Sequence, residues 1–242
     1  MLPQTEKVIE HEPKLATVHD PVDGVTLEII RANPRVQTFI RKSDEALAIV
    51  GYTEHGERHA SLVAKNARRV LKELGYPERE AELAAIAGYL HDIGNAVNRA
   101  MHAQTGATIA LRILSDYGMP DEEILEVIGA IGNHHEADGC AINAVAAALI
   151  LADKGDVHRS RVRNPDMIKF DIHDRVNYSV ERSSLKIDSA IKQIVLDLTI
   201  DTSISGVMEY FEIFLTRMLA STKAAKFLET DFSFIVNGIR LF

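Results

Sequence analysis

Histidine and carboxylate residues follow one another through the middle of this chain of 242 residues. Six of its ten histidines lie between residues 55 and 135. Imidazole nitrogens and carboxylate oxygens are the usual ligands of borderline and hard divalent metal ions. If these side chains meet in the fold, their chemistry would be that of a metal centre. The ordered series is His55, His59, His91-Asp92, His102, His134-His135 and then Asp153.

Two members of this series continue the apolar face of an expected helix. His59 stands four residues before Val63, and Asp153 stands four residues after Leu149. A buried imidazole or carboxylate needs a cation or hydrogen-bond partners. Taken singly, each is compatible with an ordinary core position, hydrogen-bonded or paired with an arginine. Convergence of several such residues from the helices of one bundle favours a metal site.

Hydrophobic periodicity and punctuation by glycine and proline predict the elements that carry the series. Gly75 and Gly118 follow expected helices, whereas Pro77 and Pro120 open others. Residues 25–50 are expected to be helical in two pieces broken near Asn33-Pro34, with Ser43 and Asp44 as candidate caps of a short helix. Further helices are predicted over about 57–74, 77–90, 102–117, 120–132 and 141–157, and a loop with a short helix over 158–176.

After residue 176 the apolar period changes to two, which is typical of strands. The alternation over 184–202 predicts an antiparallel hairpin, residues 204–229 an amphipathic helix, and residues 232–242 a further strand segment. The expected fold class is mainly α, a helical bundle with a small C-terminal α+β cap of β-β-α-β order. We expect an extended leader over 1–24, a helical metal-binding domain over 25–176 and a C-terminal α+β appendage over 177–242.

Composition excludes several classes of protein. The formal net charge is −8, from 27 basic and 35 acidic residues, which disfavours a general nucleic-acid binder. The single cysteine, Cys140, rules out an intramolecular disulfide. The N-terminal residues lack the apolar core of a signal peptide, and no window has the roughly 18 apolar residues of a membrane span. A cytoplasmic protein is expected.

The order His59, His91-Asp92, Asp153 resembles the HD superfamily of metal-dependent phosphohydrolases, over roughly residues 50–160. In that family these four residues bind one divalent ion. The remaining histidines resemble its dinuclear, HD-GYP-like branch, with Gly94 after the His-Asp pair and Gly106 after His102, but the Gly-Tyr-Pro segment is absent and Asn95 replaces the usual lysine. The metal ligands implied by the resemblance are His59, His91, Asp92, His102, His134, His135 and Asp153.

The resemblance also implies an HD-domain bundle and a reaction. The protein would hold two divalent ions (Mn, Fe, Ni, Co, Zn or Mg), with Asp92 between them. His135 would either bind one of the ions or lie next to a residue that does. Asp92 and His135 are the expected catalytic residues, and Glu136 is a candidate acceptor for a ligand imidazole. The expected activity is hydrolysis of a phosphomonoester or phosphodiester, on a nucleotide, by metal-activated hydroxide. The alternatives are a di-iron oxygenase of the same superfamily and a regulatory module that senses a nucleotide or a metal.

A phosphorylated substrate needs cationic partners, and the best-placed candidates follow Asp153. They are Lys154, Arg159 and Arg163, on or just after the same helix. The alternative is that the arginines are solvated surface residues paired with nearby aspartates. The expected partner is a small phosphorylated substrate, a nucleotide, and not a nucleic-acid polymer or a membrane. Exposed strand edges leave open a homodimer through the C-terminal appendage.

Overall fold

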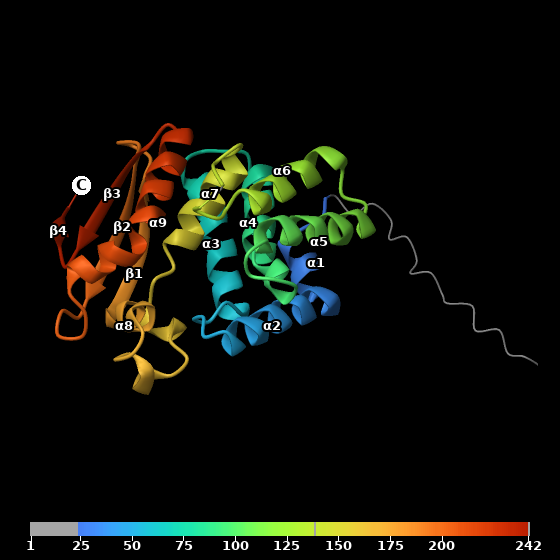
Figure 1. Ribbon diagram of the computed structural model, residues 1–242. Coiled ribbons are helices and arrows are strands. Elements are labelled where there is room, and N and C mark those ends of the chain that lie inside the picture. The colour runs from blue at the N-terminus through green and yellow to red at the C-terminus, as the bar shows by residue number, and fades with distance from the viewer. Residues whose placement is uncertain (1–23, 138, 242) are drawn as a thin grey trace, which may run out of the picture.

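The computed structural model describes residues 24–137 and 139–241 of the chain, so the leader expected over 1–24 lies outside them except for its last residue. The first part of the chain is a helical bundle (Figure 1). Its helices are α1 (Leu27–Ala32), α2 (Pro34–Ile49), α3 (Glu57–Glu73), α4 (Glu78–Leu90), the 3-10 turn η1 (Ile93–Ala96), α5 (His102–Asp116), α6 (Asp121–Gly132) and α7 (Ala144–Lys154).

The helices α4 and α7 form the centre of this bundle. Every residue of α4 from Ala81 to Leu90 is buried, and so are the residues of α7 from Val145 to Ala152. Helices this apolar on all sides are expected only where neighbours cover every face. Helix α3 packs against both of them and presents an alanine- and valine-rich face. Three of the metal-ligating candidates, His59, His91 and Asp153, therefore lie on or directly after these three closely packed helices.

A four-stranded sheet follows in the order β1-β2-β3-β4, formed by β1 (Val180–Asp188), β2 (Gln193–Ile200), β3 (Asp231–Val236) and β4 (Ile239–Arg240). The first hairpin is antiparallel, and β3 pairs parallel to β2 after the crossover helix α9 (Val207–Phe227). Tyr210 and Phe214 of α9 are buried, and the Tyr210 ring stacks on Phe234 of β3 at 5.2 Å. The fold is mainly helical with a small C-terminal sheet, as predicted, with β4 as an additional short strand.

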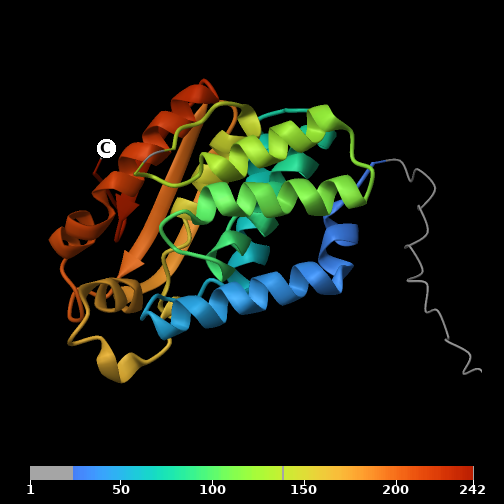
Figure 2. The ribbon, with the colours of Figure 1, turned by 45° about the vertical axis from the view of Figure 1, so that its right-hand side comes forward.

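Helix α9 packs against β3 of the sheet and against α7 of the helical bundle (Figures 1 and 2). Between α7 and β1 the chain forms two 3-10 turns, η2 (Arg159–Arg161) and η3 (Pro165–Met167), and the short helix α8 (Ile172–Ser179). Helices α8 and α9 are also joined, because Arg175 donates to Glu209 at 2.6 Å. No helix among residues 24–137 and 139–241 is long and apolar enough to cross a membrane.

One local prediction was wrong. Ser43 and Asp44 begin no helix, since both lie inside α2, where the Ser43 hydroxyl donates to the Ile93 carbonyl at 3.0 Å. On α9, the apolar residues Met208, Leu215 and Leu219 are exposed. Sequence periodicity does identify α9 as a helix, but the face that the sheet and α7 cover is set by Tyr210, Phe214 and Met218.

Candidate metal centre

Each residue of the predicted series stands at or near the end of a helix. At such positions a side chain can point past the end of its helix into the space between neighbouring elements. His59 is in the first turn of α3, His91 directly follows α4, Asp92 precedes η1, His102 opens α5, His134 follows α6 and Asp153 is in the last turn of α7.

Two glycines allow these elements to approach closely enough. A Cβ added to Gly88 of α4 would lie 2.9 Å from the backbone of Ala64 of α3, so the two helices touch through their main chains. A Cβ added to Gly94 would overlap the carbonyl oxygen of His102 at the start of α5. These contacts bring His91-Asp92 against α3 on one side and α5 on the other.

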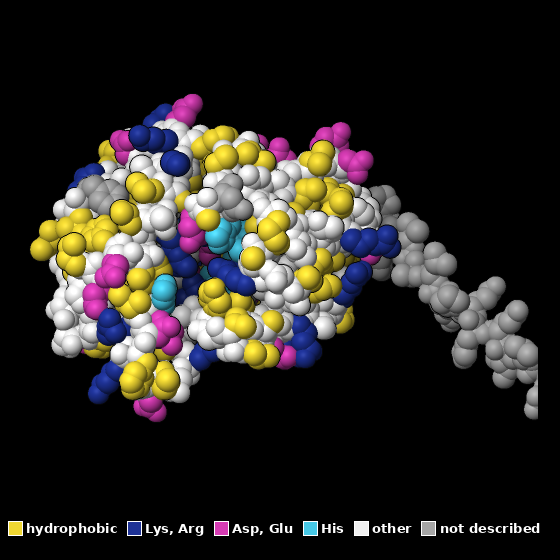
Figure 3. Space-filling view, in the orientation of Figure 1, with side chains coloured by type: hydrophobic (Ala, Val, Ile, Leu, Met, Phe, Trp, Pro, Cys, Tyr) yellow, Lys and Arg dark blue, Asp and Glu magenta, His cyan; other side chains and the backbone are white. Residues whose placement is uncertain are grey.

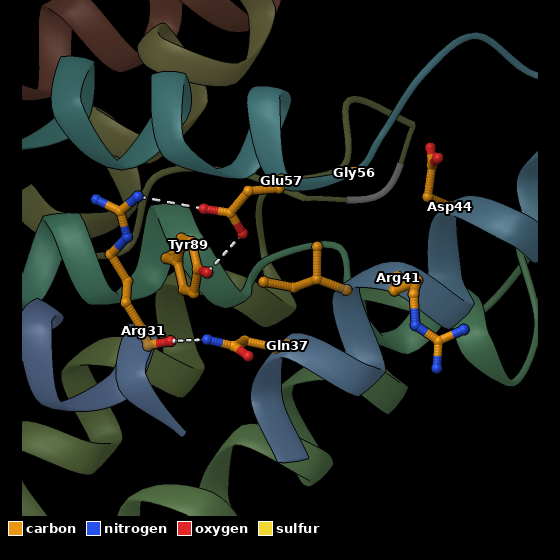
Figure 4. A pocket seen from close by; sticks show the side chains of 8 residues that line it. Arg31, Gln37, Arg41, Asp44, Gly56, Glu57 and Tyr89 are labelled. Carbon is orange, nitrogen blue, oxygen red and sulfur yellow. Dashed lines mark hydrogen bonds and ion pairs between the residues drawn. The ribbon is translucent and has the colours of Figure 1, made fainter. Parts of the chain in front are cut away.

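The start of α3 is held by a second group of contacts, around Glu57 (Figure 4). Its carboxylate accepts from the Tyr89 hydroxyl at 2.6 Å and from Arg31 at 3.2 Å, and the Arg31 guanidinium lies over the Tyr89 ring. These groups line a cavity of ≈ 490 Å³ between α1, α2 and α3. Because Arg31 and the Tyr89 hydroxyl both bind Glu57, we assign these contacts a structural role. They fix the turn of α3 that carries His59.

The carboxylate of Asp92 lies at the middle of the cluster, with different imidazoles at its two oxygens. Its Oδ2 is 3.6 Å from His59 Nε2 and 3.2 Å from His91 Nε2, and Asp153 Oδ1 is 3.4 Å from the same His59 atom. Its Oδ1 is 3.6 Å from His102 Nε2 and 4.0 Å from the equivalent atom of His134. The donors therefore form two groups that share Asp92.

The opposite nitrogen of each ring has a hydrogen-bond acceptor. His91, His102 and His134 each place Nδ1 against the carbonyl oxygen three residues earlier, at 2.8, 2.8 and 2.6 Å. His59 Nδ1 lies 2.7 Å from the Asp156 carboxylate. These acceptors assign the ring proton to Nδ1 and leave the Nε2 lone pairs facing the cluster. Glu136, the acceptor considered from the sequence, takes no part in this.

Burial and charge keep most of the cluster in the form that binds metal. Burial lowers the pKa of His102 to about 4, although Asp92 opposes this, and burial with neighbouring His91 holds the pKa of His134 well below its ordinary value. Burial would raise the pKa of Asp92, but His91 and the other imidazoles lower it well below the usual range. For His91, the pull of Asp92 outweighs burial and raises the pKa. Metal ligands must be neutral imidazoles and ionised carboxylates.

The donor geometry fits a divalent cation. The Nε2 atoms of His59 and His91 are 3.2 Å apart, and so are those of His102 and His134. With the protons on Nδ1, each pair brings two lone pairs face to face beside a carboxylate, an arrangement that a bound cation would relieve. Donors bound to one ion at about 2.1 Å are about 3.0–3.4 Å apart, close to the separations found here. Two sets of three residues could hold an ion, His59 with His91 and Asp153, and His91 with Asp92 and His134.

Two further histidines border the cluster. His55 is buried outside α3, its Nδ1 lies 2.6 Å from the Thr53 carbonyl, and its ring is 5.3 Å from that of His59. His135 is half-buried, with its ring 5.1 Å from that of His102. The Ala137 amide donates to His135 Nδ1 at 3.4 Å.

Among the predicted substrate-binding cations, only Lys154 reaches the cluster. It is buried between Glu136, at 2.6 Å, and Asp153, at 2.7 Å. Arg159 instead pairs with Glu181 at 3.0 Å. Arg163 pairs with Asp44 at 2.5 Å. The structure does not bring these two arginines to the cluster, because each satisfies a carboxylate of the surrounding framework.

A cleft of ≈ 390 Å³ opens from the cluster between the helical bundle and the C-terminal helices (Figure 3). Its walls come from the loop before α3, from α8 and from α9. Three arginines line both this cleft and the small cavity at the ligands. None of them is among the site residues predicted from the sequence. They are Arg99, Arg161 and Arg217, together with His55 and Glu136.

A family model and several known proteins match this chain. A family model described as HD domain matches residues 56–158, which include the series from His59 to Asp153. An uncharacterized protein of Methanocaldococcus jannaschii, MJ1020, is 32% identical over 209 residues, covering 77% of this chain and 79% of that protein. A crystal structure of a predicted HD superfamily hydrolase from an uncultured Thermotogales bacterium is 24% identical, with a TM-score of 0.40, and covers 54% of this chain and 73% of that one.

Ribonuclease Y proteins are also similar to part of this chain. The protein of Acetivibrio thermocellus is 31% identical over 163 residues, which are 66% of this chain but 27% of the enzyme. That of Thermus thermophilus is 35% identical over 112 residues, 43% of this chain and 18% of the enzyme. The chain thus spans only a minor part of these enzymes. The matched family model and the likeness over most of the archaeal protein lead to one conclusion: this chain belongs to the HD-domain superfamily of metal-dependent phosphohydrolases.

Proposed function

We propose that the chain hydrolyses a small phosphate ester with two divalent ions bound on either side of Asp92. The observation that carries the proposal is the division of donors between the two Asp92 oxygens. His59, His91 and Asp153 would complete the site at Oδ2, and His102 and His134 the site at Oδ1. Divalent ions in such a site, when bound, acidify water to give hydroxide near neutral pH and neutralise phosphoryl oxygens.

The protein's own groups would orient these partners and handle the proton. Asn95 donates to Asp92 Oδ1 at 2.9 Å and fixes the rotation of the shared carboxylate. His135, whose ring lies 5.1 Å from that of His102, would supply a proton to the leaving oxygen. Lys154 would hold Asp153 in place, because its ammonium is enclosed by two carboxylates. We therefore keep Asp92 and His135 as the proposed catalytic residues and assign Lys154 a positioning role.

The cleft supports a small substrate, which we take to be a phosphorylated metabolite such as a nucleotide. Its volume of ≈ 390 Å³ falls in the range of small-molecule sites. Arginine side chains at its inner end favour a phosphate ester over the uncharged or weakly charged substrate of an oxygenase. The overall charge of −8 also disfavours binding of an RNA strand, the substrate class that the name ribonuclease Y implies for those relatives.

The test combines elemental analysis with turnover. Protein reconstituted with Mn²⁺, Co²⁺, Ni²⁺ or Mg²⁺ should release phosphate from p-nitrophenyl phosphate or a nucleoside monophosphate, and should hold close to two ions per chain. Asp92→Asn should lose both metal and turnover, whereas Asp116→Asn, an exposed aspartate on α5, should keep both. Oxygen consumption by the iron-loaded protein without phosphate release would contradict the proposal and favour the oxygenase.

A further inference from the structure

Two arginines stand on opposite walls of the cleft, beside the metal-ligand cluster. Arg99 follows η1 in the helical bundle, and its Nη1 lies 3.4 Å from His102 Nε2 and 4.0 Å from Asp92 Oδ1. Arg217 belongs to α9, and its Nε donates to Glu136 at 3.4 Å. Both line the cleft and the small cavity at the ligands. A group lying beside Asp92 in the mouth of that cavity would therefore have one guanidinium on each side.

Aromatic rings hold both guanidinium groups. The Arg99 guanidinium lies 5.1 Å from the centre of the Tyr52 ring, and that of Arg217 lies 4.6 Å from the centre of the Phe214 ring. Stacking restrains the plane of a guanidinium but leaves its edge N–H groups available to a ligand. Side chains restrained in this way lose less conformational entropy when they bind.

The other cations of the cleft are held by acceptors of the protein itself. Arg161 donates to the backbone carbonyls of Glu54 and Asp156 through all three nitrogens. Lys154 is enclosed by Glu136 and Asp153. By contrast, no acceptor within residues 24–137 and 139–241 pairs with Nη2 of Arg99 or with either Nη of Arg217. These uncommitted donors are the ones a bidentate anion would use.

The outer end of the same cleft is acidic. Asp171 and Asp174 of the α8 turn line the cleft but not the cavity at the ligands. Asp174 is partly buried, and burial together with Asp171 raises its pKa. A second phosphate extending outward from the metal centre would meet these two carboxylates, whereas a hydroxyl or amino group would find acceptors there.

We infer that Arg99 and Arg217 clamp the terminal phosphate of a phosphomonoester whose leaving group is uncharged or cationic and faces Asp171 and Asp174. The inference rests on the proposed function, since the phosphate is placed against the metal centre. It narrows the substrate class, because RNA and nucleoside triphosphates carry further phosphates toward the acidic end. It also gives α9 a direct part in the site, since this helix supplies half of the clamp.

Binding of inorganic phosphate to the metal-loaded protein, measured by titration calorimetry, tests the clamp without turnover. Arg217→Gln and Arg99→Gln should each weaken phosphate binding about 10- to 100-fold, because each removes charged hydrogen bonds, and the metal content should not change. Arg112→Gln, which removes an exposed arginine of α5, is the matched control and should bind as the parent does. Parent-like phosphate affinity in Arg217→Gln, or no phosphate binding by the parent, overturns the clamp.

Turnover separates this inference from the proposed function. If the parent protein hydrolyses monoesters but Arg217→Gln keeps the parental KM, the clamp is wrong and the hydrolase stands. If phosphate binds through both arginines but no ester is cleaved, the hydrolase is wrong and the clamp stands. The acidic outer end of the cleft is tested with two nucleotides. The parent protein should hydrolyse adenosine monophosphate in preference to adenosine triphosphate, and Asp174→Asn should reduce the difference in turnover between them. Equal use of both nucleotides by the parent protein overturns the assignment of the leaving-group end.

Discussion

Residue identity and spacing predicted the ligand cluster because its members are chemically conspicuous and stand at helix ends. His59 and Asp153, placed on core-facing positions by periodicity alone, lie 3.4 Å apart through Nε2 and Oδ1. Arg99 and Arg217 were missed because an arginine is common and gives no sign of its neighbours. Their shared cleft forms only when α9 packs on the bundle and places these two residues, more than a hundred positions apart in the chain, on the same cleft.

Asp156 is a residue whose role only the structure reveals. The sequence suggested that aspartates near the arginines pair with them at the surface, yet the Asp156 side chain is 1% exposed. It accepts from Arg58 at 2.8 Å and lies 2.7 Å from His59 Nδ1. The carboxylate therefore fixes the ring that faces Asp92 and Asp153.

We predict that Asp156→Asn lowers metal affinity by roughly 10- to 100-fold, as expected when a carboxylate behind a ligand histidine loses its charge. The variant should also be less stable, since Arg58 and Arg161 lose a buried anion. Metal titration monitored by calorimetry, with Asp188→Asn on β1 as a control, measures the effect. An unchanged metal affinity would leave Asp156 with a purely structural role.

At the scale of elements, glycine and proline punctuation located the helices well. The predicted stops at Gly75 and Gly118 are real, and both glycines have positive φ, 84° and 69°. The break at Asn33-Pro34 is also real, with Asn33 capping α2. The positions of glycine and proline do not predict how closely two helices pack against each other. The sequence showed Gly94 only as part of a motif. The structure shows why this position requires glycine, because the carbonyl of His102 lies where a Cβ would be.

Gly94→Ala is therefore expected to separate η1 from α5 and to pull His102 away from Asp92. We predict a loss of stability of roughly 3 kcal/mol, the upper end for overpacking of a core, with a lower metal content. Urea denaturation and elemental analysis measure the two effects. Gly206→Ala, at a position where an added Cβ meets nothing within 4 Å, should change little. A stable Gly94→Ala variant with full metal content would refute the close-approach explanation.

At the scale of the whole molecule, the C-terminal sheet and α9 were predicted as elements but not as a wall of the site. The periodicity of α9 shows that it is amphipathic, while its partners depend on the three-dimensional packing of α7, α8 and the sheet. Glu209 connects these parts, since it accepts from Arg175 of α8 and from Ser205, both at 2.6 Å. Arg175, with Ser205 and the backbone, lowers the pKa of Glu209 to about 2.

A depressed pKa makes this connection sensitive to acid. The stabilisation is fully present above the unfolded-state pKa of 4.5 and is lost as the pH falls toward about 2. We predict that Glu209→Gln is less stable than the parent at pH 7 and that the difference narrows between pH 4.5 and 2. Urea denaturation across this range measures it, with Glu212→Gln, an exposed residue of the same helix, as the control. A difference independent of pH would contradict the prediction.

The carbonyls that orient His91, His102 and His134 belong to the main chain at Gly88, Arg99 and Ile131. No side-chain substitution can delete them, but unwinding of a single helical turn can. Fraying at the end of α4 or α6, or at the start of α5, would swing a coordinating ring out of line. In the proposed two-metal centre, ion release and local melting would be one event, and metal occupancy would report whether three separate helix ends are intact.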